Sequence, residues 1–373
     1  MKKYFENRKG ITLVALVITI IILLILATIS IQSLTNTGLF AKAQEAKEKT
    51  KNATENQAKT LNEYEDELNK YVSGTTSTQK LANKVKVGDY VTFTPDALDS
   101  NAVSTLKTNL NTYSGNSSST VNAAIKREDL KWRVLDVQNG QVRLISETPT
   151  TSKIELYGYK GYNNAVKLID DACSTLYTNT KLANKVQNLK IEDITKYMKT
   201  QPTEDTTPYS PTYKYYPEIL LKEKEQTVNE TAGTELGLSE QTEFINQTTK
   251  PQVNSWTLKK TYWKQSMNNT DSFTDSKYYE LFINNGSNYS TYWMSSRCVY
   301  ANSSNASFGV RDVSSGGVNA QGLYDSNGIG NSGDYEGSYG SAFRPVITLN
   351  SNVQIDTENS GDGSTVEQAY VIK

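Results

Sequence analysis

The stretch KKYFENRKGITLVALVITIIILLILATISI, residues 2–31, decides how the rest of the chain is organised. Its first eight residues hold four basic side chains and one acidic one, and the 21 residues from Ile11 to Ile31 carry no charge. A helix of that length spans about 30 Å, the thickness of the hydrocarbon core of a bilayer. The stretch therefore predicts a transmembrane helix over 11–34 in a single-pass protein, with the lipid bilayer as its partner. Because cytoplasmic flanks are rich in Lys and Arg, we expect a short cytoplasmic N-terminus and an extracellular C-terminal domain.

The composition of the whole chain excludes several classes of function. Its 373 residues contain 39 Lys and Arg against 40 Asp and Glu, which leaves a net charge of -1 and no basic surface for nucleic acid. No histidine is present, so Ser-His-Asp mechanisms and His-ligated metal sites are excluded. The two cysteines form no Cys-x-x-Cys motif, which excludes zinc ribbons and iron–sulfur clusters. We expect a protein that is not an enzyme and that uses no cofactor and no metal.

Gly10 stands where the basic segment meets the apolar one. The string GITLVALV, residues 10–17, resembles the processing site of type IV prepilins and type II secretion pseudopilins. The resemblance implies that a prepilin peptidase cuts between Gly10 and Ile11 and that the new amine of Ile11 is methylated. That family usually has Phe or Met where this chain has Ile11, and Glu where it has Ala15. The glutamate pairs with the amine of a neighbouring subunit, because a charge in hydrocarbon needs a partner. The motif therefore supports cleavage more strongly than it supports polymerisation. An uncleaved signal anchor is the alternative.

Changes in composition divide the remainder of the chain into a stalk, a linker and a head. Residues 39–72 are rich in Ala, Lys, Glu and Gln and hold no Pro or Gly, which favours helix. The string SGTTST, residues 73–78, has the composition of a flexible linker. The assignment is a basic leader at 1–10, the transmembrane helix at 11–34, a helical stalk at 35–72, the linker at 73–84 and the extracellular head at 85–373.

The head has strand patterns at both ends and helix patterns in the middle, which predicts an α+β fold with a mixed antiparallel sheet. Asn139-Gly140 between two apolar runs is the strongest short signal for a hairpin. The predicted strands are Val87–Phe93, Trp132–Val137, Gln141–Ser146, Asn254–Tyr262, Tyr292–Val299, Ser307–Val313, Val318–Leu323 and Phe343–Leu349. The predicted helices are Asn163–Ala183, with Val166, Ile169, Cys173 and Leu176 on one face, and Ile191–Met198, followed by a long excursion over Thr200–Lys250.

Three C-terminal strings, YWMSSR at 292–297, FGVR at 308–311 and FRPVI at 343–347, resemble the closing part of a bacterial surface module. That module is similar to the C-type-lectin-like fold shared by formylglycine-generating enzymes and some variable receptors, and WRVL at 132–135 extends the likeness. The resemblance implies a C-type-lectin-like head. Oxidase chemistry in that superfamily needs a pair of active-site cysteines, and Cys298 has no companion near it in the sequence. The Glu-Pro-Asn triplet of lectin calcium sites is absent as well.

Trp293, Arg297, Arg311 and Arg344 lie in adjacent predicted strands and are the candidate ligand-binding residues of the head. A tryptophan ring stacks on sugar rings, and guanidinium groups bind anions. The alternative is that the tryptophan belongs to the core and that the arginines pair with internal carboxylates.

Cys173 and Cys298 are both expected on the extracellular side, where disulfides persist. We predict a bridge between them, because a helix packed on a strand often brings such a pair together. Two separate buried thiols are the alternative.

These features predict a pilin-like surface protein that is anchored by its N-terminal helix and displays a binding or adhesion head. The size of the head favours a minor subunit of a type IV filament or of a secretion pseudopilus, with other pilin-like subunits as partners. The alternative is a stand-alone, signal-anchored surface module that binds a glycan or a protein and does not assemble.

Overall fold

The structure is a computed structural model that describes residues 79–200, 239–245, 270–284, 290–301, 305–327 and 335–373, together with Lys49, Thr60 and the segments 217–218, 252–253 and 265–266. The chain divides into two units, Met1–Gly74 and Thr75–Lys373. The predicted leader, transmembrane helix and stalk belong to the first unit and, apart from Lys49 and Thr60, lie outside the described residues. None of the helices in the described ranges combines the length and the apolar character that crossing a bilayer requires.

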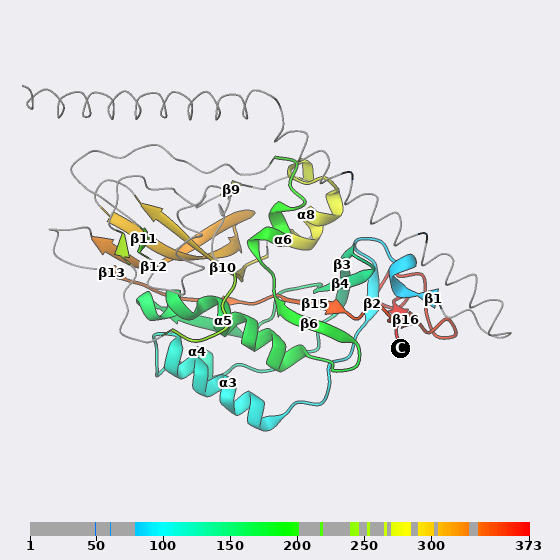
Figure 1. The fold of residues 1–373 in the computed structure, drawn as a ribbon, viewed down its shortest axis with the longest axis horizontal. Helices are drawn as coiled ribbons and strands as arrows, with labels where there is room; N and C mark the ends of the chain where they lie inside the picture. The colour runs from blue at the N-terminus through cyan, green and yellow to red at the C-terminus, as the bar shows by residue number, and fades with distance from the viewer. Residues whose placement is uncertain are drawn as a thin grey trace, which may run out of the picture. The chain divides into compact units, whose positions relative to one another are not determined.

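A six-stranded sheet forms the frame of the second unit. From edge to edge its strands are β17 (Tyr370–Val371), β2 (Tyr90–Thr92), β3 (Trp132–Gln138), β4 (Gln141–Ser146), β15 (Pro345–Leu349) and β6 (Ala183–Asn188). β17 and β2 run parallel, and the other neighbours run antiparallel. β17, the last strand of the head, thus closes the sheet beside β2. Figure 1 shows the C-terminus next to β16, whose Ile355 forms a bridge with Ile372.

The hairpin of β3 and β4 is the one that the sequence predicts. Asn139 and Gly140 have φ angles of 51° and 74°, the left-handed values that a two-residue type I′ turn requires. Trp132 pairs with Ser146 at the open end of the hairpin. The prediction of this hairpin is confirmed.

A second sheet is built from the C-terminal third of the chain. It contains β10 (Tyr292–Ala301), β11 (Asn305–Ser314), β12 (Gly317–Asn327) and β13 (Tyr335–Glu336), and β9 (Gln265–Ser266) pairs with β12. The two-stranded pairs are β14 (Ser338–Ala342) with β5 (Lys153–Tyr157), β1 (Gln79–Lys80) with β16 (Gln354–Ile355), and β7 (Pro217–Glu218) with β8 (Gln252–Val253). These pairs are antiparallel. The α+β class with antiparallel-rich sheets is confirmed, and the C-type-lectin-like form of it stays a prediction.

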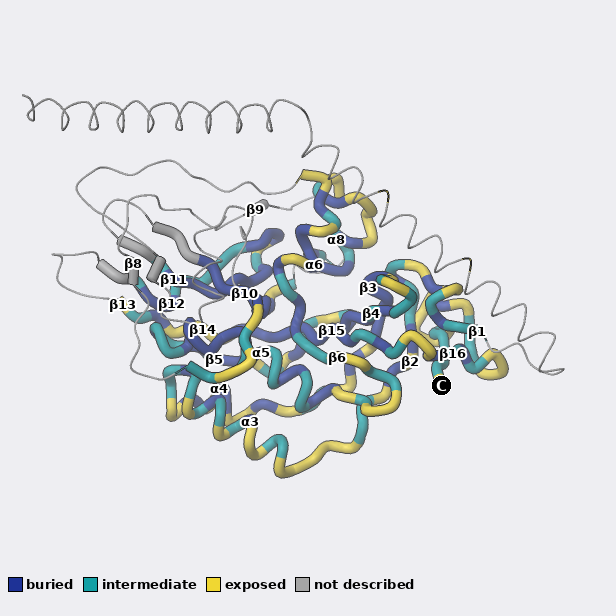
Figure 2. Tube along the Cα trace, in the orientation of Figure 1, coloured by how far each residue is buried: buried dark blue, intermediate teal, exposed yellow. Residues whose placement is uncertain are grey.

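Helix α5 is the central helix of the head. The described helices are α3 (Ser100–Tyr113), α4 (Thr120–Ala123), α5 (Gly158–Tyr177), α6 (Ile191–Thr195) and α8 (Ser276–Phe282), with the 3-10 turns η1 (Leu81–Asn83) and η2 (Thr270–Ser272). α5 packs against β5, β6, β10 and α3. In Figure 1, α3 and α4 lie on the side of α5 that faces away from the second sheet. Most of α5 is buried, and Figure 2 shows it dark along much of its length.

The hairpin is buried on both of its faces. Val134 and Leu144 belong to one hydrophobic cluster, which also contains the buried face of α5. Their neighbours Leu135 and Ile145 belong to a second cluster, which contains residues of α6 and α8. Successive side chains of a strand point to opposite faces, so the sheet has helices packed on both sides. This explains why two apolar residues stand side by side in each strand, Val134-Leu135 in β3 and Leu144-Ile145 in β4, where a strand with a single buried face would alternate.

Both ends of α5 differ from the sequence prediction. α5 begins at Gly158 and ends at Tyr177, whereas the pattern predicted Asn163–Ala183. Thr178 takes an extended conformation, which ends the helix, and Ala183 starts strand β6 instead. The predicted buried face of the helix, including Ile169 and Cys173, is confirmed.

The folded head also begins earlier in the chain than predicted. Residues 79–84 belong to the predicted linker. In the structure, residues 79–80 form β1, which pairs with β16, and Leu81 is fully buried. This part of the linker assignment is wrong, because the apolar side chain of Leu81 packs into the main core. The predicted strand Asn254–Tyr262 lies outside the described residues.

Gly115, between α3 and α4, provides a test of this packing. Its φ is 89°, and a Cβ added there would lie 2.0 Å from the carbonyl oxygen of Tyr157. We expect Gly115→Ala to lower the free energy of unfolding by about 2 kcal/mol, measured by chemical denaturation, because the backbone is strained and must move. Gly340→Ala is the matched control, since the nearest atom to its added Cβ is 3.9 Å away. Equal effects of the two changes would contradict the packing described here.

Candidate functional site

The four residues predicted to bind a ligand are buried in the head. Trp293, Arg297 and Arg344 have no exposed surface, and Arg311 is 1% exposed. A ligand outside the head cannot reach them. The prediction that they form a surface site is therefore wrong, and their contacts show what they do instead.

Arg344 closes the junction between β15 and the end of β4. Its Nε and Nη2 donate to the carbonyl oxygen of Ser146 at 3.1 and 3.0 Å, and Nη2 also donates to that of Glu147 at 2.9 Å. Its guanidinium carbon lies 5.2 Å from the centre of the Tyr292 ring. Burial lowers the pKa of Arg344. The side chain therefore satisfies backbone carbonyls that would otherwise be buried without partners.

Trp293 and Arg297 join β10 to two other elements. The indole Nε1 of Trp293 donates to the carbonyl oxygen of Ile154 in β5 at 2.8 Å. Arg297 Nη1 donates to the carbonyl oxygen of Asn163 in α5 at 2.8 Å. These bonds are internal, so the two side chains hold β10 against its neighbours.

Cys173 and Cys298 are both buried and free, so the predicted disulfide is not formed. Cys173 Sγ lies 3.8 Å from Asn188 Oδ1, whereas Cys298 Sγ lies 3.7 Å from the carbonyl oxygen of Gly309 in the neighbouring strand. Each thiol thus contacts a different polar group of the protein, and the two sulfur atoms are not bonded to each other. Burial raises the pKa of Cys298 to about 12 and that of Cys173 well above its ordinary value. Both thiols stay protonated at neutral pH, which is unsuited to nucleophilic chemistry.

An ion-pair network fastens α6 to the hairpin. Arg143 donates to the two oxygens of Asp136 at 2.8 and 2.5 Å and to Asp193 Oδ1 at 2.5 Å. Asp193 also accepts the backbone N–H of Lys190 at the start of α6, and the Tyr197 hydroxyl donates to Asp136. Burial alone raises the pKa of Asp136, but the hydrogen bonds and the charge of Arg143 outweigh it and keep that pKa below its ordinary value. The paired charges satisfy one another, so the network is structural.

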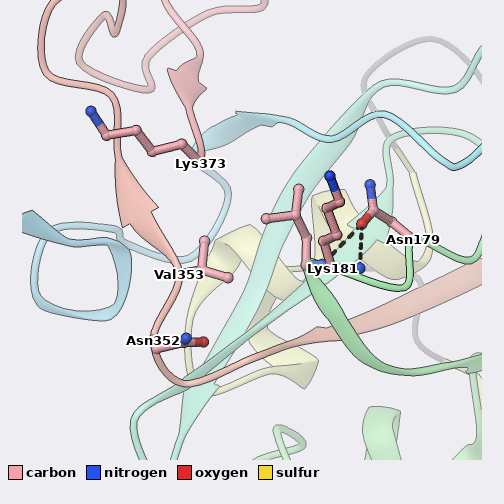
Figure 3. Close-up of a pocket in the computed structure, with 6 residues that line it drawn as sticks. Asn179, Lys181, Asn352, Val353 and Lys373 are labelled. Carbon is pink, nitrogen blue, oxygen red and sulfur yellow. Dashed lines mark hydrogen bonds between the residues drawn. The ribbon is translucent and has the colours of Figure 1, made fainter.

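A shallow hollow of about 370 Å³ lies near the end of the chain (Figure 3). It is lined by Asn179, Lys181, Leu182, Asn352, Val353 and Lys373. Asn179 Oδ1 accepts the backbone N–H groups of Lys181 and Leu182 at 3.0 and 2.9 Å, and its Nδ2 donates to the carbonyl oxygen of Thr94 at 2.8 Å. The amine of Lys373 lies 3.8 Å from Asp356 Oδ1. Because these polar groups are engaged with the protein itself, the hollow is a weak candidate for a ligand site.

A second pocket, of about 270 Å³, has an aromatic wall and is called the aromatic pocket below. It is lined by Phe93, Thr94, Pro95, Arg127, Glu128, Asp129, Leu130, Trp132 and Tyr177. The Trp132 ring meets those of Phe93 and Tyr177 edge to face, with centroids 5.4 and 5.8 Å apart. The lining comes from the segment after β2, the segment before β3, the first residue of β3 and the last residue of α5.

Arg127 is held rigidly at the aromatic pocket. Its Nε donates to the carbonyl oxygen of Leu176 at 2.7 Å and its Nη2 to that of Asp96 at 2.6 Å. Glu128 accepts the backbone N–H groups of Thr151 and Ser152 at 2.8 and 2.7 Å. Arg127 and Glu128 are thus fixed by backbone groups around them, which gives this part of the pocket a preformed geometry.

The sequence did not indicate the aromatic pocket. Trp132 was assigned to a strand within the lectin-like resemblance and not to a site, and Arg127 and Tyr177 lie about 50 residues apart in the chain with no shared motif. Gly10 and Ile11, the predicted cleavage residues, lie outside the described residues. Within the ranges that the structure describes, no three or more Cys, Asp or Glu side chains gather as metal ligands would.

Comparison with known proteins finds no similar protein. The chain matches no known protein-family model, no curated protein and no solved structure.

The internal role of Arg344 predicts a stability effect. We expect Arg344→Met to lower the free energy of unfolding by about 3 kcal/mol, because the carbonyl groups of Ser146 and Glu147 lose their donor. Lys131→Met is the matched control, since Lys131 is half exposed and pairs only with the exposed Asp129. Chemical denaturation of the full-length protein measures both. Wild-type stability in Arg344→Met would contradict the structural role.

The network around Asp136 predicts a pH dependence of stability. Its folded-state pKa is lowered, so its contribution is present above the unfolded-state pKa of about 3.9 and is lost as the pH falls through the folded-state value. We expect Asp136→Asn to remove about 3 kcal/mol at pH 7 and to flatten the loss of stability below pH 4. Asp271→Asn, at an exposed pair 4.0 Å from Lys199, should change little. Parallel pH profiles for Asp136→Asn and wild type would refute the assignment.

Proposed function

We propose that the chain is a non-enzymatic, pilin-like surface protein, held in the membrane by residues 11–34 and displaying the unit Thr75–Lys373 as an extracellular binding or adhesion head. The observation that carries the proposal is the junction at Gly10, where a basic segment meets 21 uncharged residues in the pattern of a prepilin processing site. The division of the chain at Gly74 is compatible with an anchor and a head that are separate units. Prepilin peptidase, the bilayer and other pilin-like subunits are the proposed partners.

The chemistry of the head favours binding over catalysis. Arg297 and Arg344, two of the predicted ligand-binding residues, bond to backbone carbonyls, and both thiols are buried and protonated. The carboxylates of the network around Arg143 are paired. The aromatic pocket, by contrast, is preformed, and its lining has the mixture of apolar walls and few polar groups that small-ligand sites share.

A stand-alone anchored module is the second candidate function. Ala15 favours it, because the glutamate that pairs with a neighbouring subunit in pilin assembly is missing. In this case the head binds its glycan or protein ligand without entering a filament or pseudopilus.

Replacing Gly10 with Phe tests the processing of the N-terminus. We expect the mature protein to retain residues 1–10, seen as a higher intact mass, and to disappear from sheared surface fractions if the chain assembles. Gly38→Phe is the control for a bulky residue elsewhere in the anchor unit, and it should be cleaved normally. An unchanged mature mass in Gly10→Phe would contradict cleavage. Normal cleavage of wild type without any surface assembly would favour the stand-alone module.

A further inference from the structure

The aromatic pocket contains hydrogen-bond donors that the protein itself does not use. Trp132 is only 3% exposed, and its indole N–H makes no hydrogen bond to any residue that the structure describes. The other buried tryptophan of the described chain, Trp293, donates to a carbonyl at 2.8 Å. The indole nitrogen of Trp132 keeps some accessible surface, since it is not one of the fully buried polar atoms that lack a partner, and an indole N–H in such a position normally bonds to water or to a ligand. The N–H of Trp132 is therefore available to a ligand in the pocket.

Two further donors line the same pocket. The Tyr177 hydroxyl accepts the backbone N–H of Glu128 at 3.2 Å, and its own proton has no acceptor among the described residues. Burial raises the pKa of Tyr177, so the hydroxyl remains a donor at any physiological pH. Arg127 uses Nε and Nη2 on backbone carbonyls, which leaves Nη1 without a hydrogen bond to the described part of the chain. Trp132, Tyr177 and Arg127 thus each offer an unused donor to the pocket, and a ligand that meets them must bring an acceptor.

The charges around the pocket favour a neutral acceptor. The guanidinium of Arg127 is accompanied by the carboxylates of Glu128 and Asp129, so the lining has no net positive charge. A carboxylate or phosphate ligand would face these two acidic groups with a single cation. A carbonyl oxygen accepts from N–H and O–H donors without that repulsion.

The size and the walls of the pocket narrow the ligand further. A volume of about 270 Å³ suits one small group rather than an extended chain. Phe93, Pro95 and Leu130 supply apolar surface, which favours a methyl group beside the carbonyl. Thr94 and the carboxylate of Asp129, which is 90% exposed, stand at the rim and can accept hydroxyl protons. An acetamido group on a hydroxyl-bearing ring has all three features.

We propose that the aromatic pocket binds N-acetylated sugars by enclosing their acetamido group. The carbonyl oxygen accepts from the indole N–H of Trp132, with Tyr177 and Arg127 as further donors. The methyl group contacts the apolar wall, and the ring hydroxyls bond to Thr94 and Asp129 at the rim. This assignment deepens the binding head of the proposed function and names the class of its ligand.

The test titrates full-length protein in detergent micelles with N-acetylglucosamine, and glucose and an acetylated-lysine peptide are measured in parallel by ligand-observed NMR. We expect saturable binding of N-acetylglucosamine and none of glucose, which lacks the acetamido group. Trp132→Phe keeps an aromatic ring but removes the N–H, and it should weaken binding about tenfold. Lys181→Ala, in the hollow of Figure 3, is the matched control and should bind as wild type does.

Each other outcome overturns the assignment in a distinct way. Equal binding of glucose would show that the acetamido group is not recognised. Tighter binding of the acetylated peptide would show that the pocket is a peptide site. An unchanged affinity of Trp132→Phe for N-acetylglucosamine, with a thermal melt like that of wild type, would show that the indole N–H does not bind the ligand. No binding of N-acetylglucosamine would end the proposal but would leave the anchor and its cleavage at Gly10 untouched, because neither is measured in this experiment.

Discussion

The side-chain amide of Asn188, fully buried, bonds to several elements of the head at once. Its Nδ2 donates to the carbonyl oxygens of Leu189 and Trp293 at 3.0 and 2.8 Å, and its Oδ1 accepts the backbone N–H of Arg344 at 2.6 Å. Its own backbone N–H donates to Asp170 of α5 at 2.9 Å. One residue thereby joins β6, β15, β10 and the central helix, and so connects the two large sheets. A buried amide must satisfy its donors and acceptor, so this arrangement admits only one register of these strands.

Local patterns predicted the parts of the fold that local chemistry determines. The Asn139-Gly140 hairpin formed as expected, because those residues adopt the left-handed angles that its turn needs. Strand β6 was missed, since its sequence, ANKVQN, has no strand pattern and becomes a strand only by pairing with β15. The early start of α5 and the helix Ser100–Tyr113 were missed for a similar reason, because packing against the rest of the head decides them.

The candidate site was less predictable than the fold, because burial depends on residues that are remote in the sequence. Arg344 has the chemistry of an anion ligand, and only the carbonyl groups of Ser146 and Glu147, about 200 residues away, show that it serves the interior. Conversely, Trp132 has the pattern of an ordinary core residue, and its unused N–H becomes visible only once Tyr177 is folded beside it. A binding pocket assembled from separate segments carries no motif, which is why sequence patterns pointed to the buried arginines instead.

The proposed function requires the apolar segment of residues 11–34 to lie in a lipid bilayer and Thr75–Lys373 to lie outside the cell. Brief trypsin treatment of intact cells, followed by mass spectrometry of the released peptides and fractionation of the remaining cells, tests this directly. We expect peptides of the head to be released from intact cells and the untreated protein to leave the membrane fraction only with detergent. Full-length protein in the cytosolic fraction without detergent, protected from trypsin until the cells are lysed, would contradict the proposed function.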